Sequence, residues 1–186
     1  GENVLTDISF KAKKGQTIAV IGSTGSGKST LINLIPRYYD VTKGSVKVDG
    51  VDVRDMTQKE LRDKLGYVPQ KGVLFSGTID SNIRYGKPEI TDAQVKEAAE
   101  VAQATEFIDT KPEKYESPVS QGGTNVSGGQ KQRLSIARAI AKDPEIFIFD
   151  DSFSALDFKT DSQLRKALKE YTKDATTVIV AQRIST

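Results

Sequence analysis

Residues 17–30, "TIAVIGSTGSGKST", decide the fold of this chain. The apolar run 17–21 predicts a buried strand, and the apolar spacing after Lys28 predicts a helix that Pro36 ends. Between them, Gly22 to Ser29 match the pattern G-x-x-x-x-G-K-[ST] in full, with the strand before and the helix after that the pattern requires. The stretch therefore predicts an α/β fold built around a phosphate-binding loop.

The loop has the chemistry that a triphosphate needs. Its glycines let several backbone N–H groups converge on phosphate oxygens, and the following helix adds the positive end of its dipole. Lys28 is expected to reach the β- and γ-phosphates, and the Ser29 hydroxyl is expected to bind Mg²⁺. A glycine-rich turn without chemistry is the alternative, but motif and context agree. The predicted nucleotide-binding residues are Gly22, Ser23, Thr24, Gly25, Ser26, Gly27, Lys28, Ser29 and Thr30.

A second acidic motif, "IFIFDD" at 146–151, follows much later in the chain. Asp150 ends an apolar strand, and open α/β sheets bind their ligands at the carboxyl ends of strands. A carboxylate there can hold Mg²⁺ directly or through water. The alternative, an aspartate that caps the next helix, is weaker because the phosphate loop lies upstream. Together the two motifs predict binding of ATP with Mg²⁺.

Strands and helices alternate at both ends of the chain, with helices alone between them. Further strands are expected at 4–10 (an edge strand), 44–50, 66–70, 146–151 and 176–181, and further helices at 57–65, 78–86, 91–108, 129–142 and 159–171. Thr57, with Glu60 three residues later, predicts a capping box. The pattern predicts a P-loop, RecA-like α/β core with a mostly parallel sheet and an antiparallel edge, formed by 1–71 and 142–186, and an inserted helical subdomain at 72–141.

Composition excludes several other kinds of site. The 186 residues contain no cysteine and no histidine, so a disulfide, a thiolate site or a zinc site is not expected. The net charge is +2, from 27 basic and 25 acidic residues that are interspersed, which gives no reason to expect nucleic acid as a partner. No apolar run approaches the roughly 20 residues that cross a bilayer, so the piece itself is expected to be soluble.

The motif "NVSGGQ", Asn125 to Gln130, narrows the class. With it the chain resembles the ATPase domain of ABC transporters of the exporter type, whose signature is usually Leu-Ser-Gly-Gly-Gln; here Val126 takes the first place. Gln70 in "YVPQ" resembles the family's Q-loop, and "SALD" at 154–157 resembles its D-loop. "VLFSGTIDSNI" and "SPVSQGG" resemble segments of exporters, so the likeness covers nearly the whole chain.

The resemblance implies a paired machine. In the family, two ATPase domains join head to tail, and each ATP lies between one domain's phosphate loop and the other's signature. Ser127, Gly128, Gly129 and Gln130 are thus expected to act on the partner's ATP, and Gln70 to serve the metal and catalysis. The helical subdomain and Q-loop are expected to contact a transmembrane domain, at the cytoplasmic face of the membrane. The alternative is that "SGGQ" merely caps a helix.

Two residues depart from the family pattern in the same site. Asp151 stands where hydrolytic members carry Glu, and Gln182 stands where they carry His. Asp is shorter by one carbon, roughly 1.5 Å, and a misplacement of about 1 Å can cost on the order of 10²-fold in rate. Glutamine cannot carry a proton as imidazole does. The chain is therefore expected to bind MgATP, to hydrolyse it slowly, and to resemble the degenerate-site subunit of a heterodimeric bacterial multidrug exporter.

Other interpretations remain open at this point. Asp151 and Gln182 are also explained by tolerated drift, or by substitutions made to trap ATP. The ATPases of chromosome maintenance and DNA repair share a signature motif, but they carry long coiled coils, and this chain has no sustained heptad pattern. An ATP-dependent scaffolding module is a third class. The family also places an adenine-stacking aromatic residue upstream of residue 1, so the chain is expected to be a truncated piece of a longer membrane protein.

Overall fold

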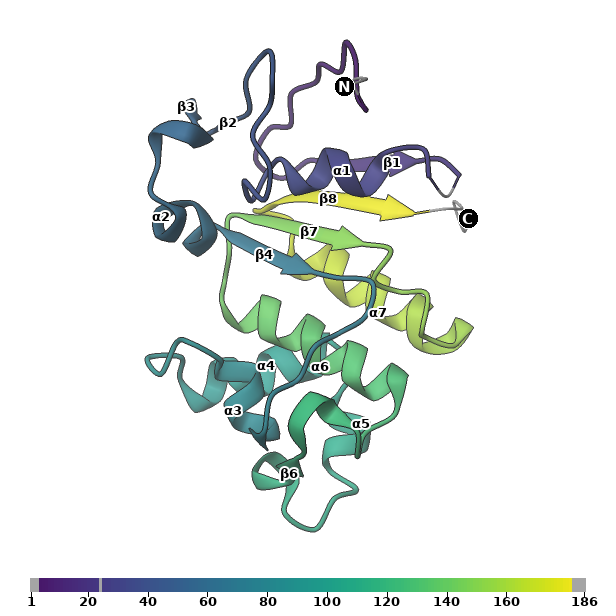
Figure 1. Cartoon of the computed structure of the whole chain (residues 1–186). Coiled ribbons are helices and arrows are strands. Elements are labelled where there is room, and N and C mark those ends of the chain that lie inside the picture. The colour runs from purple at the N-terminus through teal and green to yellow at the C-terminus, as the bar shows by residue number, and fades with distance from the viewer. Residues whose placement is uncertain (1–3, 24, 182–186) are drawn as a thin grey trace.

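A four-stranded parallel sheet lies at the centre of the molecule (Figure 1). The structure, a computed structural model, describes residues 4–23 and 25–181. Its strands are β1 (Thr17–Ile21), β4 (Leu65–Val68), β7 (Ile146–Asp150) and β8 (Thr176–Ala181), in the order β1-β8-β7-β4. All neighbours run parallel, so the carboxyl ends of the strands lie at one edge. The predicted α/β class with a mostly parallel core is confirmed.

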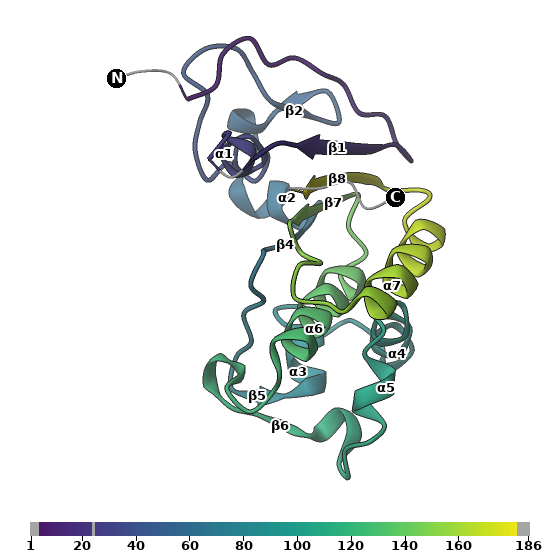
Figure 2. The same ribbon diagram turned by 90° about the vertical axis from the view of Figure 1, so that its right-hand side faces the viewer.

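Helices cover both faces of this sheet, because side chains alternate between the faces along each strand. Ile32 of α1 (Lys28–Asn33) is buried with Ile148 and Val178 on one face. Phe147 and Phe149 point to the other face, into the cluster that holds residues of α6 (Gly128–Ala141) and α7 (Phe158–Tyr171). Figure 2 shows α1 on one side of the sheet, with α6 and α7 on the other.

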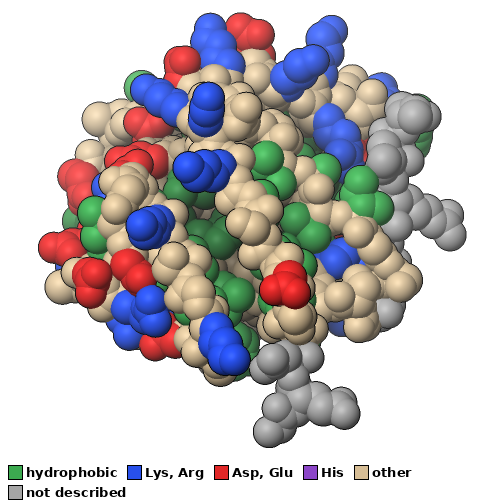
Figure 3. Space-filling model, turned by 90° about the horizontal axis from the view of Figure 1, so that it is seen from above, with side chains coloured by type: hydrophobic (Ala, Val, Ile, Leu, Met, Phe, Trp, Pro, Cys, Tyr) green, Lys and Arg blue, Asp and Glu red, His purple; other side chains and the backbone are tan. Residues whose placement is uncertain are grey.

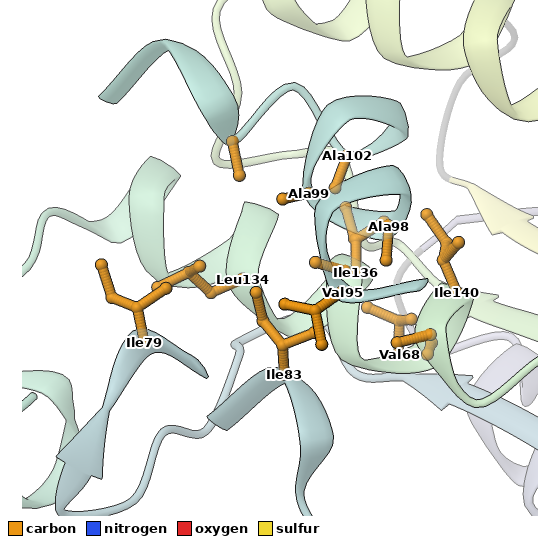
Figure 4. Packing of buried hydrophobic residues seen from close by; sticks show 14 of the residues in the cluster. Val68, Ile79, Ile83, Val95, Ala98, Ala99, Ala102, Leu134, Ile136 and Ile140 are labelled. Carbon is orange, nitrogen blue, oxygen red and sulfur yellow. The ribbon is translucent and has the colours of Figure 1, made fainter. Parts of the chain in front are cut away.

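The middle of the chain forms a group of helices. These are α3 (Ile79–Arg84), α4 (Asp92–Val101), α5 (Thr105–Ile108) and α6. Figure 4 shows isoleucines of α3 meeting Leu134 and Ile136 of α6 and the small side chains of α4, with Val68 of β4 close by. The same cluster includes Phe147 and Phe149 of the sheet, so one continuous core joins the helices to the strands.

Capping boxes begin four of the helices. The predicted box is present, because Thr57 and Glu60 exchange side-chain and backbone hydrogen bonds at the start of α2 (Gln58–Asp63). Threonine or serine plays the same part at α3, α4 and α6, with N-caps Thr78, Thr91 and Ser127. The helical pattern across 91–108 is interrupted, since Gln103 adopts a left-handed backbone with a φ of 60° and separates α4 from α5.

Two short antiparallel pairs lie outside the main sheet. One joins β2 (Lys47–Val48) to β3 (Val51–Asp52), and the other joins β5 (Gly77–Thr78) to β6 (Pro118–Val119). The strand expected over 44–50 is thus only two residues long. Asp49 and Gly50 both have positive φ and form the hairpin turn instead. Short 3₁₀ turns occur at Val53–Asp55, Lys114–Glu116 and Gln121–Gly123.

Two predictions about the N-terminal part were wrong. Residues 4–10 form no strand, because Asp7 adopts a left-handed backbone with a φ of 55°, which a ladder cannot include. The side chains of Val4, Ile8 and Phe10 are exposed. Seen from above, the surface of the molecule carries hydrophobic groups among lysines and arginines (Figure 3). β1 is a strand as expected, but it lies at the sheet edge and is not buried; Ile21 is 49% exposed.

Candidate nucleotide site

The phosphate loop connects β1 to α1 at the carboxyl edge of the sheet (Figure 1). Gly25 and Gly27 have φ values of 81° and 90°, a conformation that side-chain-bearing residues rarely adopt. α1 begins directly after Gly27, and no side chain caps its first turn. Its N-terminal N–H groups are therefore available to an anion. Thr24, one of the predicted ligands, lies outside the described residues.

The Lys28 side chain lies along this loop. Its ammonium group donates to the carbonyl oxygen of Gly22 and, at 3.0 Å, to that of Ser23. These bonds place the only cation of the motif among the loop's own peptide groups. The ammonium group has three N–H donors, so a phosphate oxygen can accept the third or displace one of these carbonyls, because a charged acceptor is the stronger partner.

Ser29 and Asp150 meet although 121 residues separate them. The Ser29 Oγ donates to the Asp150 carboxylate, at 3.3 Å from Oδ1 and 3.4 Å from Oδ2. This is the juxtaposition that the two motifs predict, and a hydroxyl with a carboxylate suits Mg²⁺, which takes one or two protein oxygens beside substrate phosphates. No group of three or more acidic side chains among the described residues is placed to hold a metal by itself. The Ser29 hydroxyl and the Asp150 carboxylate, in contact, fit a magnesium ion that is bound together with a nucleotide.

The second aspartate is paired with the predicted Q-loop residue. Gln70 Nε2 donates to Asp151 Oδ2 at 3.3 Å. The backbone of Asp151 has a φ of 50°, and its N–H donates to Val180 O at 2.8 Å, which ties the turn after β7 to β8. Partial burial, followed by the charge of neighbouring Asp150, raises the pKa of Asp151. Gln70 thus lies against Asp151, whereas Ser29 lies against Asp150. Gln182 lies outside the described residues.

Sequence reasoning missed a tyrosine beside Asp150. Tyr67 lies on β4, and its hydroxyl is 3.3 Å from Asp150 Oδ2 and 3.1 Å from Asn33 Oδ1. Burial first, and then the charge of Asp150, raise the pKa of Tyr67, so the phenol keeps its proton and can donate it. The signal in the sequence was a tyrosine inside an apolar strand, but only pairing of β4 with β7 reveals what it faces.

A buried glutamine of α6 was missed as well. The Gln132 amide accepts from the Gly72 N–H at 2.7 Å and donates to Pro69 O at 2.9 Å, so it holds both ends of the segment that contains Gln70. Ser152 adds a buried bond from its Oγ to Val68 O at 2.7 Å. α6 begins one turn earlier with the signature motif, and this single helix therefore links the signature to the segment after β4.

The signature residues cap α6. Ser127 Oγ accepts from the Gln130 N–H at 3.1 Å, and Ser127 N–H donates to Gln130 Oε1 at 3.3 Å. The hydroxyl still has its own proton to donate, and no other part of the described chain, beyond α6 itself, lies within 4 Å of where a side chain on Gly128 would begin. Capping and anion binding are therefore compatible. Figure 1 shows the start of α6 in the lower part of the molecule, away from the β1–α1 loop in the upper part.

These features define a P-loop nucleotide-binding protein: a parallel sheet, a phosphate loop at the carboxyl end of one strand, and an aspartate at the end of another. A family model described as ABC transporter matches residues 5–154. The chain belongs to the ABC transporter family, of which it is an ATP-binding domain.

Individual proteins are similar over nearly the whole chain. A Bacillus subtilis (strain 168) protein named for multidrug export as an ATP-binding/permease protein is 48% identical over 185 residues, which cover 100% of this chain and 32% of that protein. A protein of Staphylococcus aureus (strain Mu50) with the same kind of name is 48% identical over 183 residues, 98% of this chain and 32% of its own length.

One solved structure, of a bacterial Atm1-family ABC exporter with ATP bound, matches with a TM-score of 0.91 and 39% identity, over 97% of this chain and 32% of that one. The chain thus spans about a third of the length of these relatives. Within the part of the chain that the structure describes, no helix has the length and apolar character that a membrane crossing requires.

Proposed function

We propose that this chain is the ATPase domain of an exporter, which pairs head to tail with a second ABC ATPase domain around ATP and Mg²⁺ and couples hydrolysis to export. One observation carries the proposal: two helix starts that suit an anion, after the loop from Gly22 to Ser29 and at Ser127 of α6, lie in different parts of the molecule. A single ATP cannot use both. The names of the relatives, multidrug export proteins and an Atm1-family exporter, support the transport role.

The connection between the phosphate loop and the signature favours a transporter over the chromosome-maintenance class. Between Ser29 and Ser127 the longest helix of the described chain is α4, with 10 residues. A coiled coil of that other class needs heptads sustained over much greater lengths. The short helices instead pack into the core that they share with the sheet.

In the proposed site the residues have separate tasks. The loop N–H groups and Lys28 bind the phosphates, while Ser29 and Asp150 hold Mg²⁺. When bound, the metal ion neutralises charge on the phosphoryl oxygens. Asp151, held by Gln70, occupies the place of the general base, but its side chain is shorter than that of glutamate. We therefore propose slow hydrolysis in this chain's own site, and a different chain as the partner whose ATP the signature completes.

The double variant Asp151→Glu, Gln182→His is expected to raise the rate of ATP hydrolysis by roughly 10²-fold in the dimer, because it restores the reach of the base and a group that can carry a proton. The measurement is phosphate release at saturating MgATP, for the wild type and the variant. Asp174→Glu, a change of the same kind at an exposed turn, is the control and should change nothing. If the wild type already releases phosphate as fast as the double variant, the proposal of slow turnover is contradicted.

The variant Ser127→Asp distinguishes the capping of α6 from the proposed binding of the partner's ATP by Ser127. Aspartate caps helices about as well as serine, so the free energy of unfolding should stay within about 0.5 kcal/mol of the wild type. Its negative charge should repel the partner's phosphates and abolish ATP-dependent dimers in sedimentation. Thr91→Asp, at the capping box of α4, is the matched control and should dimerise normally. Intact dimerisation of Ser127→Asp would contradict the role of the signature.

A groove of about 380 Å³ between the sheet and the helical part is the proposed contact for a transmembrane domain. It runs past Pro69, next to Gln70, and its walls include Val73, Tyr85 and Arg138. Val73 and Tyr85 are 52% and 56% exposed, so apolar surface is open there beside charged groups. Because one wall adjoins the Q-loop, a segment that docks in the groove can sense changes at the ATP site.

A further inference from the structure

Tyr67 occupies a position from which it can orient the metal-binding aspartate. On β4 it pairs in register with Ile148, two residues before Asp150 on the neighbouring strand β7. Its half-buried side chain lies on the α1 face of the sheet, within the cluster that contains Ile32 and Ile148. The hydroxyl is 3.3 Å from Asp150 Oδ2 and 3.1 Å from Asn33 Oδ1. The phenol therefore touches both the end of β7 and the end of α1.

The number of available protons decides which groups donate in the contacts among Asn33, Tyr67 and Asp150. A phenol has a single proton and cannot donate to both acceptors at once. The oxygen and nitrogen of an asparagine amide exchange places by a half-turn, and their assignment follows from the hydrogen-bond network. With the Asn33 nitrogen turned to the phenol oxygen, it donates to Tyr67, and Tyr67 donates to Asp150. Each group is then satisfied, and the proton goes to the charged acceptor, which forms the stronger bond.

Ser29 cannot keep the same hold on Asp150 when magnesium is bound. Its hydroxyl is the other contact of the carboxylate, at 3.3 Å from Oδ1, and in the proposed site this hydroxyl binds the metal. We propose that Tyr67 is a positioning residue, which holds Oδ2 of Asp150 through its hydroxyl and so orients the carboxylate toward the Mg²⁺ of MgATP. This inference rests on the proposed function. Outer partners of metal ligands typically change metal affinity by about 10- to 100-fold when they are lost.

The ring of Tyr67 is fixed independently of its hydroxyl. The ring of Tyr38 packs edge-on against it, with centroids 5.8 Å apart and an angle of 74°, and the Arg62 guanidinium lies 5.7 Å from the Tyr38 centroid. The remainder of the Tyr67 ring packs against the cluster that contains Ile32 and Ile148. Tyr67→Phe should therefore keep the ring in place and remove only the hydroxyl, with its contacts to Asp150 and Asn33.

The test compares affinities for ATP with and without magnesium, by titration calorimetry of the 186-residue chain. In Tyr67→Phe the dissociation constant for ATP in EDTA should stay within about twofold of the wild type, while that for MgATP should rise roughly 10-fold. A wild type that binds ATP equally well with and without magnesium would overturn the metal site itself, and this proposal with it. If magnesium increases the ATP affinity of Tyr67→Phe as much as it increases that of the wild type, the role of Tyr67 alone is overturned.

Two further variants distinguish positioning from a general structural effect. Tyr38→Phe removes a hydroxyl from the neighbouring ring and should leave both dissociation constants unchanged. In an Asp150→Asn background, Tyr67→Phe should add no further loss of MgATP affinity, because the two side chains act through one bond. An equal loss in both backgrounds would show that Tyr67 acts without Asp150 and would overturn the inference.

Discussion

Replacing Lys28 with alanine should lower the affinity of the chain for MgATP by at least about 100-fold. Lys28 is the one cation of the phosphate loop, and its ammonium group already lies within reach of two loop carbonyls, from Gly22 and Ser23. A hydrogen bond to a charged group contributes about 1.5–3 kcal/mol, and every 1.4 kcal/mol is about tenfold in affinity. The loss of contacts to two phosphates should therefore lower the affinity for MgATP by more than about a hundredfold.

The measurement is equilibrium binding of MgATP at two salt concentrations. Lys96→Ala, a charge change on the exposed face of α4, is the control and should bind as the wild type does. The melting temperature of Lys28→Ala without nucleotide should stay close to that of the wild type, because the hydrogen bonds of Lys28 within the described residues go to carbonyls of its own loop. Affinity within threefold of the wild type would show that the loop does not bind the phosphates through this lysine.

Replacing Arg138 with leucine should destabilise the chain by about 3 kcal/mol, because the buried Asn82 and the backbone carbonyl of Val73 lose charged donors. The guanidinium donates to the backbone oxygens of Val73 and Asn82, each at 2.8 Å, and to Asn82 Oδ1 at 3.0 Å. It also lies 5.3 Å and 5.4 Å from the ring centroids of Phe75 and Tyr85, which stack on each other. Arg138 therefore joins α6 to α3 and to the segment after Gln70.

Thermal and urea unfolding of Arg138→Leu measure this loss, and a fall of roughly 10 °C in Tm is expected for a chain of this size. Arg37→Leu is the matched control. Its guanidinium pairs with Asp40 at the surface, so its removal should leave Tm near that of the wild type. Arg138→Lys should recover only part of the loss, since a lysine cannot serve three acceptors with the planar fork of arginine. A Tm for Arg138→Leu equal to that of the control would contradict the bracing role.

Local pattern was sufficient for the elements with a strong period or a strong cap. The helix after the phosphate loop, the capping box of Thr57 and Glu60, and the strand ending at Asp150 all lie where the sequence predicts them. These features depend on contacts within a few residues. The predicted strand at 4–10 failed for the opposite reason. A strand requires a neighbour in space, and in the described chain these residues have none, with Asp7 turned to positive φ.

Some contacts of the candidate site can be predicted from sequence motifs, and others depend on how the strands pair and the helices pack. Ser29 and Asp150 belong to motifs with known partners, and their contact across 121 residues was predictable. No motif assigns a role to Tyr67, although it begins "YVPQ", or to Gln132, and their partners come from β7 and from the segment after β4. Such contacts are set when strands pair and helices pack, at separations along the chain that no local pattern encodes.

The sequence alone thus determined the chemistry of this protein: a phosphate loop, an acidic strand end, and a signature that marks the ABC transporter family. Glycine conformations, charges and helix starts are properties of short segments, and a short segment can be read in isolation. The tertiary structure decided which side chain orients Asp150, which residue braces α6, and that β1 lies at an edge. These depend on which surfaces come together when the core closes, and that choice is made by the whole chain at once.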